Sequence, residues 1–347
     1  MDGRTALRMT RQRLHDPVDE QEYLTLFRLL SPVQTTYWCA PGQPPALALR
    51  TTFNDRVYNG ELRARRAIVK GRFMRGAIGY VAEQDLELFA CAYHKDGVPS
   101  SDEQEMLYLF RQEGPMNIGQ IKGITGLRSK DIAAVLHKLQ EKFLVFEDQI
   151  DSESDRGWFL FAGEFPTVDL HRLSRAEAIS HILHRFVQAH GFFTLQMARS
   201  FYGFTLKDMQ NALAGLCEDG RLISIDLQGE QGYTRPEDEG LLRTPCEPIT
   251  GIHVLHRSDF LVKSDEEYLK GRYKYEDFDE LHYILMDGCW QGAVVGRFRN
   301  GPFDIQDVVL EDPDQGQARK AEIIAAIARV YDLEASPIYR FCGEIQW

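Results

Sequence analysis

Long apolar runs and paired cysteines are both missing from this sequence. No stretch approaches the roughly 18 uninterrupted apolar residues of a membrane-spanning helix. The basic N-terminal stretch MDGRTALRMTRQRL lacks the apolar core of a secretory signal. The six cysteines stand singly, with no C-x-x-C pair and no paired Cys/His spacing. These absences argue against a membrane protein, a zinc motif and a disulfide framework, and they favour a reducing, cytoplasmic setting.

Glycine-rich nucleotide motifs are also absent. The sequence has no G-x-x-x-x-G-K-[ST] loop, no G-x-G-x-x-G turn and no cluster of metal ligands at a recognisable spacing. We therefore expect neither a metal ion nor a nucleotide cofactor. The 347 residues, of which 44% are hydrophobic and 27% charged, are enough for about two to four globular domains.

Charge is distributed unevenly along the chain. The net charge is −12, yet residues 1–80 hold 13 Lys and Arg against 7 Asp and Glu, a local charge of +6. A basic N-terminal part on an acidic body can still direct a polyanion to one face. The total charge alone favours a different class, an interaction protein that never contacts DNA, and this alternative stays open.

An internal repeat is the strongest pattern in the sequence. Residues 106–139 align without a gap with residues 183–216, at a constant offset of 77. The pair Lys130-Asp131 matches Lys207-Asp208, and glycines and leucines recur at equivalent positions. Two copies of one supersecondary unit explain this match.

Each copy predicts a helix, a short second helix, a third helix and a two-stranded hairpin. In the first copy the helical stretches are SSDEQEMLYLFRQEG, NIGQIKGITG and SKDIAAVLHKLQEKF, and the hairpin joins FLVFED to GWFLFAG. This order is typical of a winged helix-turn-helix. The third helix either reads a DNA groove or serves as scaffold. Both interpretations stay open because neither copy presents an arginine-rich outer face.

Six cations crowd into 13 residues of the N-terminal part. The stretch ELRARRAIVKGRFMRGAIGYV carries Arg63, Arg65, Arg66, Lys70, Arg72 and Arg75, with no acidic residue between Arg63 and Val81. The glycines between them permit a close approach of DNA, so we expect contacts to phosphate. The alternative is a solvated basic face. The stretch AEQDLELFACAYHK follows as an amphipathic helix and completes a third helix-and-strand unit.

Polar and aromatic side chains meet in the stretch SPVQTTYWCAPGQPPALAL. Gln34 and Thr36 can hold a water molecule, and Tyr37 and Trp38 can stack on DNA bases. For Gln34 the alternative is a polar residue that caps a strand. For the two aromatics the alternative is packing in a core.

The last hundred residues predict a separate β-rich, barrel-like domain. Asp287-Gly288 and Asn300-Gly301 are hairpin turns between apolar runs, and QARKAEIIAAIARVYDL is an amphipathic terminal helix. The predicted fold class is therefore α+β, with three tandem winged helix-turn-helix domains before this domain. The expected domain boundaries are 1–98, 99–168, 169–245 and 246–347.

These features together resemble the tandem winged-helix DNA glycosylases of the AlkZ/YcaQ-like family. The stretch AIVKGRFMRGAIGYVAEQDLELF is similar to a run around M-R-G in that family. The motif R-x-x-R-Q-R-L near the start, the glutamine stretch after the first long helix, and MDGCWQGAVVGRF in the last domain follow in the family's order.

The resemblance implies a monofunctional DNA glycosylase that hydrolyses the N-glycosidic bond of alkylated or crosslinked bases. In the family a Gln-x-Gln or Gln-x-Asp pair orients the attacking water, and the matching residues here are Gln34 and Thr36. The family's Thr and His after M-R-G are replaced here by Ala77 and Gly79. Because of these departures, the alternative is a non-catalytic DNA-binding or regulatory protein on the same scaffold.

Double-stranded DNA, damaged or intact, is the expected partner. The residues expected to contact it are Arg63, Arg65, Arg66, Lys70, Arg72, Arg75, Tyr37 and Trp38. We expect no membrane contact, and we expect a monomer in the cytoplasm that associates with the nucleoid if the source is bacterial.

Overall fold

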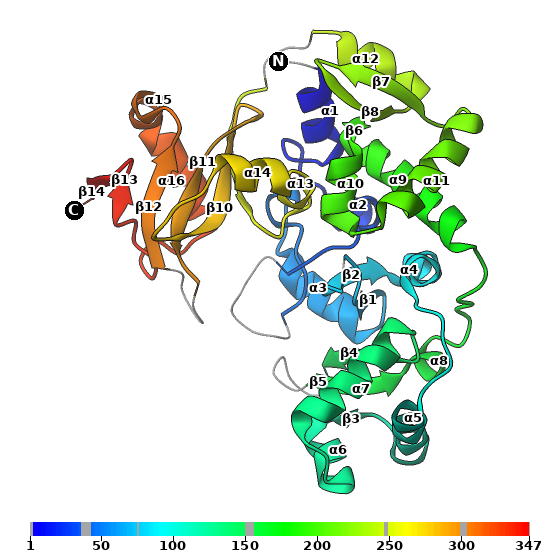
Figure 1. The fold of residues 1–347 in the computed structure, drawn as a ribbon. Coiled ribbons are helices and arrows are strands. Elements are labelled where there is room, and N and C mark those ends of the chain that lie inside the picture. Colours follow the sequence, from blue (N-terminus) through cyan, green and yellow to red (C-terminus); the bar gives the residue numbers. More distant parts are fainter. Residues whose placement is uncertain are drawn as a thin grey trace.

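The computed structural model of this protein describes residues 3–35, 43–74, 76–149, 156–245, 249–298 and 304–346. Figure 1 shows the helical part of the chain on the right and a β-rich unit, residues 249–346, on the left. Within the described ranges, none of the helices combines the length and the apolarity needed to cross a bilayer.

The first unit is built from helices around a small hairpin. Its elements are α1 (Gly3–Arg11), α2 (Glu20–Leu29), the 3-10 turn η1 (Ala48–Arg50), α3 (Asp55–Ala64), β1 (Ile68–Gly71), β2 (Gly79–Ala82), the 3-10 turn η2 (Glu83–Asp85) and α4 (Leu86–Tyr93). The carboxylate of Asp19 accepts hydrogen bonds from the amides of Gln21 and Glu22, which starts α2. β1 and β2 pair antiparallel, and Val33 adds a single antiparallel bridge to Tyr80 of β2.

The second unit contains three helices and a three-stranded sheet. Its elements are α5 (Ser101–Glu113), β3 (Met116–Asn117), α6 (Ile118–Thr125), α7 (Ser129–Glu141), β4 (Val145–Gln149), β5 (Arg156–Leu160) and α8 (Phe161–Glu164). Capping boxes at Ser100–Glu103 and Asn117–Gln120 start α5 and α6, and Gly126 ends α6 in the left-handed conformation. The strand order is β3-β5-β4.

The third unit repeats this plan. Its elements are α9 (Arg175–His190), β6 (Phe192–Phe193), α10 (Leu195–Tyr202), α11 (Leu206–Glu218), β7 (Ile223–Leu227), β8 (Glu230–Thr234), the 3-10 turn η3 (Pro236–Asp238) and α12 (Glu239–Arg243). The strand order β6-β8-β7 is the counterpart of β3-β5-β4. The repeat predicted at an offset of 77 is therefore confirmed in both element order and strand order.

The first unit follows the same plan with one difference. The bridge from Val33 to Tyr80 takes the place that β3 and β6 hold beside β5 and β8. The short second helix of the other two units has no counterpart among the described residues between Gln34 and Asn54, where η1 is the one helical element.

The β-rich unit is an open sheet with helices on its faces. Its elements are β9 (Ile252–His256), α13 (Phe260–Ser264), α14 (Glu266–Arg272), β10 (Asp279–Met286), β11 (Cys289–Arg297), β12 (Asp304–Leu310), α15 (Pro313–Ala318), α16 (Lys320–Ala328), β13 (Arg340–Phe341) and β14 (Glu344–Ile345). The strand order is β14-β13-β12-β11-β10-β9, with β9 and β14 at the two edges. Asp287 and Gly288 both have positive φ and form the predicted hairpin turn, while Asn300-Gly301 lies outside the described residues.

The predicted barrel-like closure of this unit is wrong. One face of the sheet packs against Ile323 and Ile327 of α16, and the other packs against Leu261 and Leu269 of the helical layer. Because helices cover both faces, β10 and β11 are buried along most of their length, and no described strand pairs β9 with β14. The unbroken apolar runs that predicted a barrel reflect this double coverage.

Arginines of α1 form ion pairs with acidic residues of other units of the chain. Arg8 pairs with Asp265 of the β-rich unit at 2.8 Å, and Arg11 pairs with Asp238 of the third unit at 2.6 Å. α1 packs against α9 and α12, between the helical part and the β-rich unit (Figure 1). Part of the basic excess of residues 1–80 therefore neutralises acidic groups that lie far away in the sequence.

Candidate active site and nucleic-acid interface

Gln34 follows directly on the bridge that joins Val33 to Tyr80. Its Nε2 donates a hydrogen bond to the carbonyl of Ile78 at 3.2 Å, which fixes the orientation of the amide. Its Oε1 is buried and has no hydrogen-bond partner among the described residues. A buried acceptor without a donor is costly in a folded protein unless a water or a ligand satisfies it. Gln34 therefore holds one oriented and unsatisfied acceptor at this position.

The segment before Gln34 can lie close to β2 because residue 79 is a glycine. A Cβ atom at Gly79 would lie 2.8 Å from the Cβ of Pro32, which is closer than real Cβ contacts allow. Glycine at this position therefore lets the segment before Gln34 lie against β2. The family's histidine is replaced by this glycine, and the replacement has a packing role here.

A small cavity beside Gln34 has room for a single water. It leaves about 10 Å³ open to the centre of a water molecule, close to the least that one water needs. Its polar lining comes from Gln34, Arg50, Ser258 and Asp259. Residues from the first unit and from the β-rich unit thus meet at one point.

Arg50 and Asp259 form a buried ion pair across this cavity. Two nitrogens of the guanidinium donate to the two carboxylate oxygens at 2.5 and 3.0 Å, and both side chains are almost completely buried. Asp259 also accepts the amide of Leu261 at 2.9 Å and so starts α13. The pair fixes the β-rich unit to the segment that follows the glutamine stretch. The sequence offered no local signal for it, since the partners are separated by 209 residues.

Four predicted site residues lie outside the described residues: Thr36, Tyr37, Trp38 and Arg75. Their expected roles, with Thr36 beside the water, Tyr37 and Trp38 on bases and Arg75 on phosphate, stay predictions.

Most of the described cations of the basic run contact the second unit. Lys70 and Glu147 form a salt bridge at 2.6 Å, in which both side chains are about 2% exposed. Arg72 donates to the side chain of Gln140 at 2.7 Å, and Arg63 lies 4.0 Å from Asp148. These groups therefore hold the first unit against β4 and α7.

Arg66 also belongs to this contact. It pairs with Asp148, and its guanidinium lies 5.2 Å from the ring centre of Phe146 and 5.0 Å from that of Phe159. Sequence predicted phosphate contacts for these cations, but in the structure they contact the second unit. Their acidic and polar partners follow about 70 to 85 residues later in the chain. A count of charges within one stretch cannot detect such partners.

Arg65 is the described cation of the run that points to solvent. It is exposed at the C-terminal end of α3 and forms no ion pair with any described residue. Lys130 and Lys138 of α7 are exposed as well. These three side chains are available to a polyanion.

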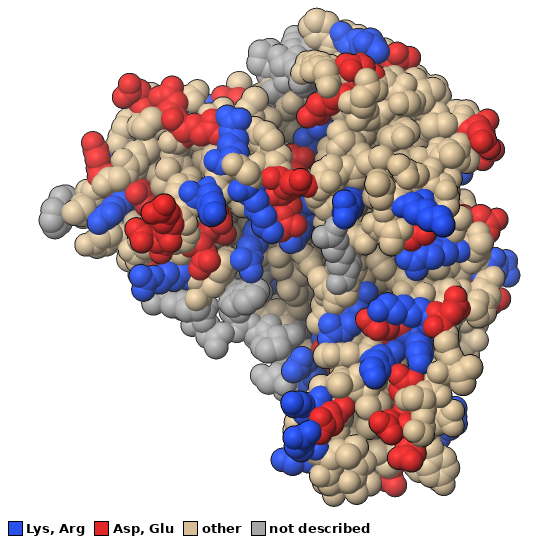
Figure 2. Space-filling view, viewed as in Figure 1, with Lys and Arg blue, Asp and Glu red and all other residues tan. Residues whose placement is uncertain are grey.

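A wider recess lies between α3 and the β-rich unit. Its volume is about 870 Å³, and its lining includes Arg56, Arg329 and His256. Figure 2 shows Lys and Arg side chains on both sides of the hollow between the β-rich unit and the lower helical unit. The recess adjoins the small cavity, since Ala46 lines both.

His256 supplies a neutral donor to this recess. Burial, together with the nearby charges of Arg257 and Lys263, lowers the pKa of His256 to about 3. Its Nδ1 accepts the amide of Ser258 at 3.1 Å, so the proton of the neutral ring is on Nε2. That Nε2 is buried without a partner among the described residues.

Asp55 holds the wall between the two cavities. Its carboxylate accepts the amide of Leu47 at 2.5 Å and the hydroxyl of Tyr23 at 3.4 Å. Burial raises the pKa of Asp55 to about 6, despite these hydrogen bonds. At neutral pH the buried, ionised carboxylate therefore lowers the free energy of unfolding.

The pH dependence of stability is expected to change in Asp55→Asn. The folded protein binds the proton of Asp55 more tightly than the unfolded chain does, so wild-type stability falls as the pH rises from about 4 through about 6. Between pH 4.5 and 7.5 the wild type should lose about 2 kcal/mol more unfolding free energy than the variant does. Denaturant unfolding at several pH values measures this difference, and equal slopes would contradict it.

The fold and the site define a mixed α+β protein in which repeated helix-and-sheet units carry an open β-sheet. The chain belongs to the AlkZ-like DNA glycosylase family, whose model matches residues 148–332. This confirms the predicted family. Its structure is similar to that of Streptomyces sahachiroi DNA glycosylase AlkZ, with a TM-score of 0.70 and 16% sequence identity over 98% of this chain and 97% of that chain. No curated protein matches the sequence.

Proposed function

We propose that this chain is a monofunctional DNA glycosylase that hydrolyses the N-glycosidic bond of alkylated or crosslinked bases in duplex DNA. The observation that carries this proposal is the amide of Gln34, which is oriented by Ile78 and leaves a buried acceptor beside space for one water. Membership of the AlkZ-like DNA glycosylase family supports glycosylase chemistry in general. The family match begins at residue 148, so the role of Gln34 rests on its geometry.

The proposed reaction needs little from the protein beyond a positioned water. An N-alkylated purine is cationic, so the bond from C1′ to the base nitrogen breaks with both electrons going to a base that leaves neutral. A water that donates one proton to Gln34 Oε1 keeps a lone pair free for the cationic C1′. Its second proton leaves to solvent as the C1′–O bond forms. Thr36 is proposed as the second group on this water.

The lining of the small cavity supports a water nucleophile. Among its described residues there is no lysine, and a lysine or amine is what a covalent imine intermediate with the sugar would require. The charged groups there, Arg50 and Asp259, are bound to each other. This composition favours a monofunctional enzyme over one that also cleaves the DNA strand.

The helical units are proposed to be three winged helix-turn-helix domains, 1–98, 99–168 and 169–245, followed by the β-rich domain 246–347. The order helix, strand, helix, helix, strand, strand in the second and third units supports this assignment. In the first unit the Val33 bridge and the β1–β2 hairpin support it.

The DNA is proposed to lie in the recess between α3 and the β-rich unit. Arg56 and Arg329 line this recess, and together with the exposed Arg65 they are proposed to contact phosphate. Arg75, Tyr37 and Trp38 are also proposed to contact the DNA. Arg63, Arg66, Lys70 and Arg72 are proposed to act indirectly, by holding the second unit in place.

The direct test is incubation with duplex DNA that carries an alkylated purine or a crosslink, followed by alkaline cleavage at abasic sites. The proposal expects abasic sites with wild type, and it expects them to form far more slowly with Gln34→Ala. If wild type binds the duplex but yields no abasic sites, the chain is a non-catalytic DNA-binding protein on the same scaffold.

Arg65→Ala should weaken binding to undamaged duplex DNA by about 3- to 10-fold near 100 mM salt. The loss of one phosphate contact should also reduce the slope of log Kd against log salt by about 1. Fluorescence anisotropy across a salt series measures both quantities. Arg111→Ala is the matched control, because Arg111 is also exposed but lies on α5. Equal effects of the two substitutions would show that Arg65 acts only through net charge.

A further inference from the structure

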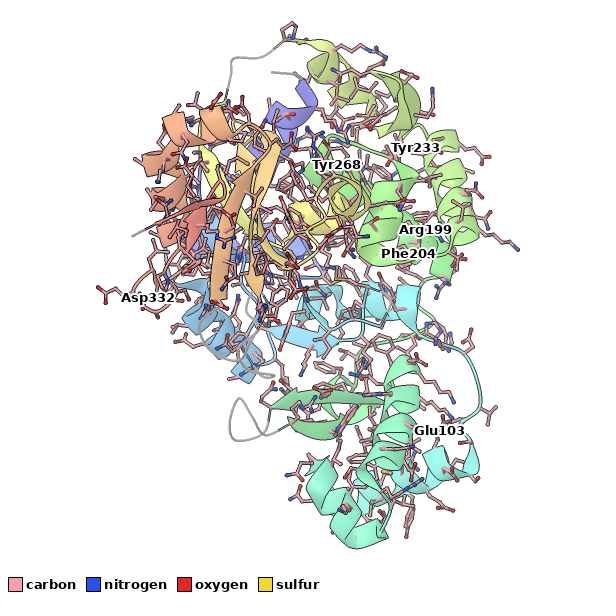
Figure 3. All side chains as sticks on the ribbon, turned by 60° about the vertical axis from the view of Figure 1, so that its left-hand side comes forward. Glu103, Arg199, Phe204, Tyr233, Tyr268 and Asp332 are labelled. Carbon is pink, nitrogen blue, oxygen red and sulfur yellow. The ribbon has the colours of Figure 1, made fainter. Side chains whose placement is uncertain are left out.

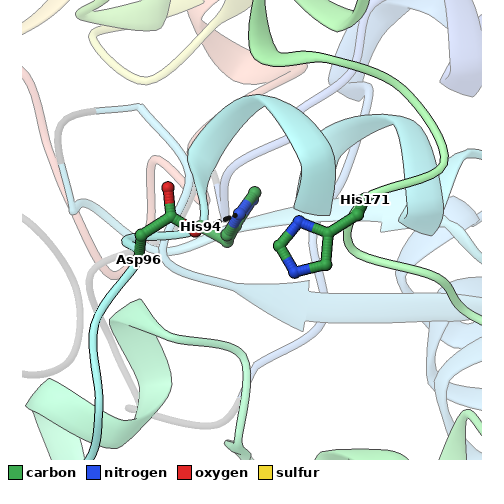
Figure 4. Close-up of side chains that lie close together, drawn as sticks. All are labelled: His94, Asp96 and His171. Carbon is green, nitrogen blue, oxygen red and sulfur yellow. Dashed lines mark hydrogen bonds and ion pairs between the residues drawn. The ribbon is translucent and has the colours of Figure 1, made fainter.

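Two histidines and one carboxylate meet at the junction of the first three units. The Nε2 of His94 lies 3.2 Å from Oδ1 of Asp96, and one donor atom from each of His94, Asp96 and His171 lies within 4.8 Å of the others. The rings of His94 and His171 are 5.2 Å apart at an angle of 84° (Figure 4). We propose that these three side chains bind a divalent transition-metal ion of the zinc class.

The tautomer of His94 supports this proposal. Its Nδ1 lies 3.2 Å from the carbonyl of Ala90, which can only accept, so Nδ1 carries the proton. The other nitrogen then directs a lone pair at the Asp96 carboxylate. Two acceptors at 3.2 Å require a cation between them, either a second proton or a metal ion. A backbone carbonyl on the far nitrogen is also the usual way in which proteins orient a metal-binding histidine.

The backbone that carries His171 is fixed by separate contacts. The amide of His171 donates to Oδ1 of Asp169 at 2.9 Å. The amide of Asp169 donates to Glu87 of α4 at 3.0 Å, and its carbonyl accepts the Cys91 thiol at 3.5 Å. His171 is therefore held beside α4 whether or not an ion is present, which lowers the entropy that binding has to overcome.

The donor set selects the class of ion. Two imidazoles and one carboxylate are ligands that Zn²⁺ accepts in a four-coordinate site, with water in the fourth position. Donors around a tetrahedral zinc ion lie about 3.3 Å apart, so His94 and Asp96 already stand at the required spacing. Asp96 and His171 are exposed, which leaves access for the ion and for the water ligand.

The ion would join the two segments by which the chain enters and leaves the second unit. His94 and Asp96 precede α5, and His171 precedes α9. Figure 3 shows the second unit, where Glu103 is labelled, standing apart from the third unit, where Arg199 and Phe204 are labelled. A metal at this junction would therefore tie together the segments that enter and leave the second unit. The two histidines are 77 residues apart, like the two copies of the repeat, so a motif scan of neighbouring residues cannot find them.

The test is titration of the chelator-treated full-length protein with Zn²⁺, by calorimetry and by competition with a chromophoric chelator. Wild type should bind one ion at this site, and His94→Ala and His171→Ala should each weaken its binding at least tenfold. His181→Ala, which removes an exposed histidine of α9, should leave binding unchanged. Zn²⁺ should also raise the thermal unfolding temperature of wild type but not of His171→Ala.

Two outcomes would overturn the proposal. One is the absence of stoichiometric Zn²⁺ binding to wild type. The other is binding that survives in His171→Ala, which would place the ion elsewhere. Circular dichroism of the metal-free variants tests separately for misfolding. Because His171 is exposed, His171→Ala should leave the spectrum unchanged.

Discussion

Gln34→Ala is expected to lower the single-turnover rate of base release by about 100-fold, with duplex affinity unchanged within about twofold. The substitution removes the acceptor that orients the water but no cation that contacts phosphate. It also leaves the Ile78 carbonyl without its donor, and water can replace that donor. A loss in the chemical step without a loss in binding is the signature of an interaction made only in the transition state.

Two further variants make this prediction specific. Gln34→Asn keeps an amide but shortens it by one methylene, so it should lose most of the activity as well, because reach decides the position of the water. Gln196→Ala is the matched control, since Gln196 is an exposed amide on α10 and should leave the rate unchanged. If Gln34→Ala keeps its rate within about threefold of wild type, the water is held by other groups.

Local structure was predictable where its cause is local. Gly126 ends a helix and Asp287-Gly288 forms a hairpin turn because their own backbone preferences decide these features. The repeat was predictable because two copies of one unit bury the same positions, such as Leu136 and Leu213. The family was predictable because the motifs that carry the resemblance are contiguous stretches of sequence.

The role of the basic run was not predictable from the sequence. Lys70 has the composition of a phosphate contact, yet Glu147 neutralises it in the interior. No residue near Lys70 in the sequence indicates a pairing with Glu147. The pair forms only because the second unit packs against the first. The same holds for the candidate site, where sequence suggested Gln34 but not the Arg50–Asp259 pair beside it.

Loss of the carboxylate in Asp259→Ala is expected to destabilise the protein by about 3–5 kcal/mol. The guanidinium of Arg50 would stay buried without its counter-charge, and α13 would lose the side chain that caps it. Breaking one side of a buried pair costs far more than the pair itself contributes, because the remaining charge is desolvated. Denaturant unfolding, followed by fluorescence and by circular dichroism, measures the change.

The double variant Arg50→Met/Asp259→Leu separates this cause from a general loss of packing. With both charges removed, stability should return to within about 1–2 kcal/mol of wild type, the remainder being the lost helix cap. Asp131→Ala breaks an exposed pair with Arg128 and should cost less than about 1 kcal/mol. A double variant as unstable as Asp259→Ala would mean that shape, rather than buried charge, holds the β-rich unit at this point. If the double variant folds but no longer releases bases, the Arg50–Asp259 pair also contributes to the polar wall that keeps the water beside Gln34.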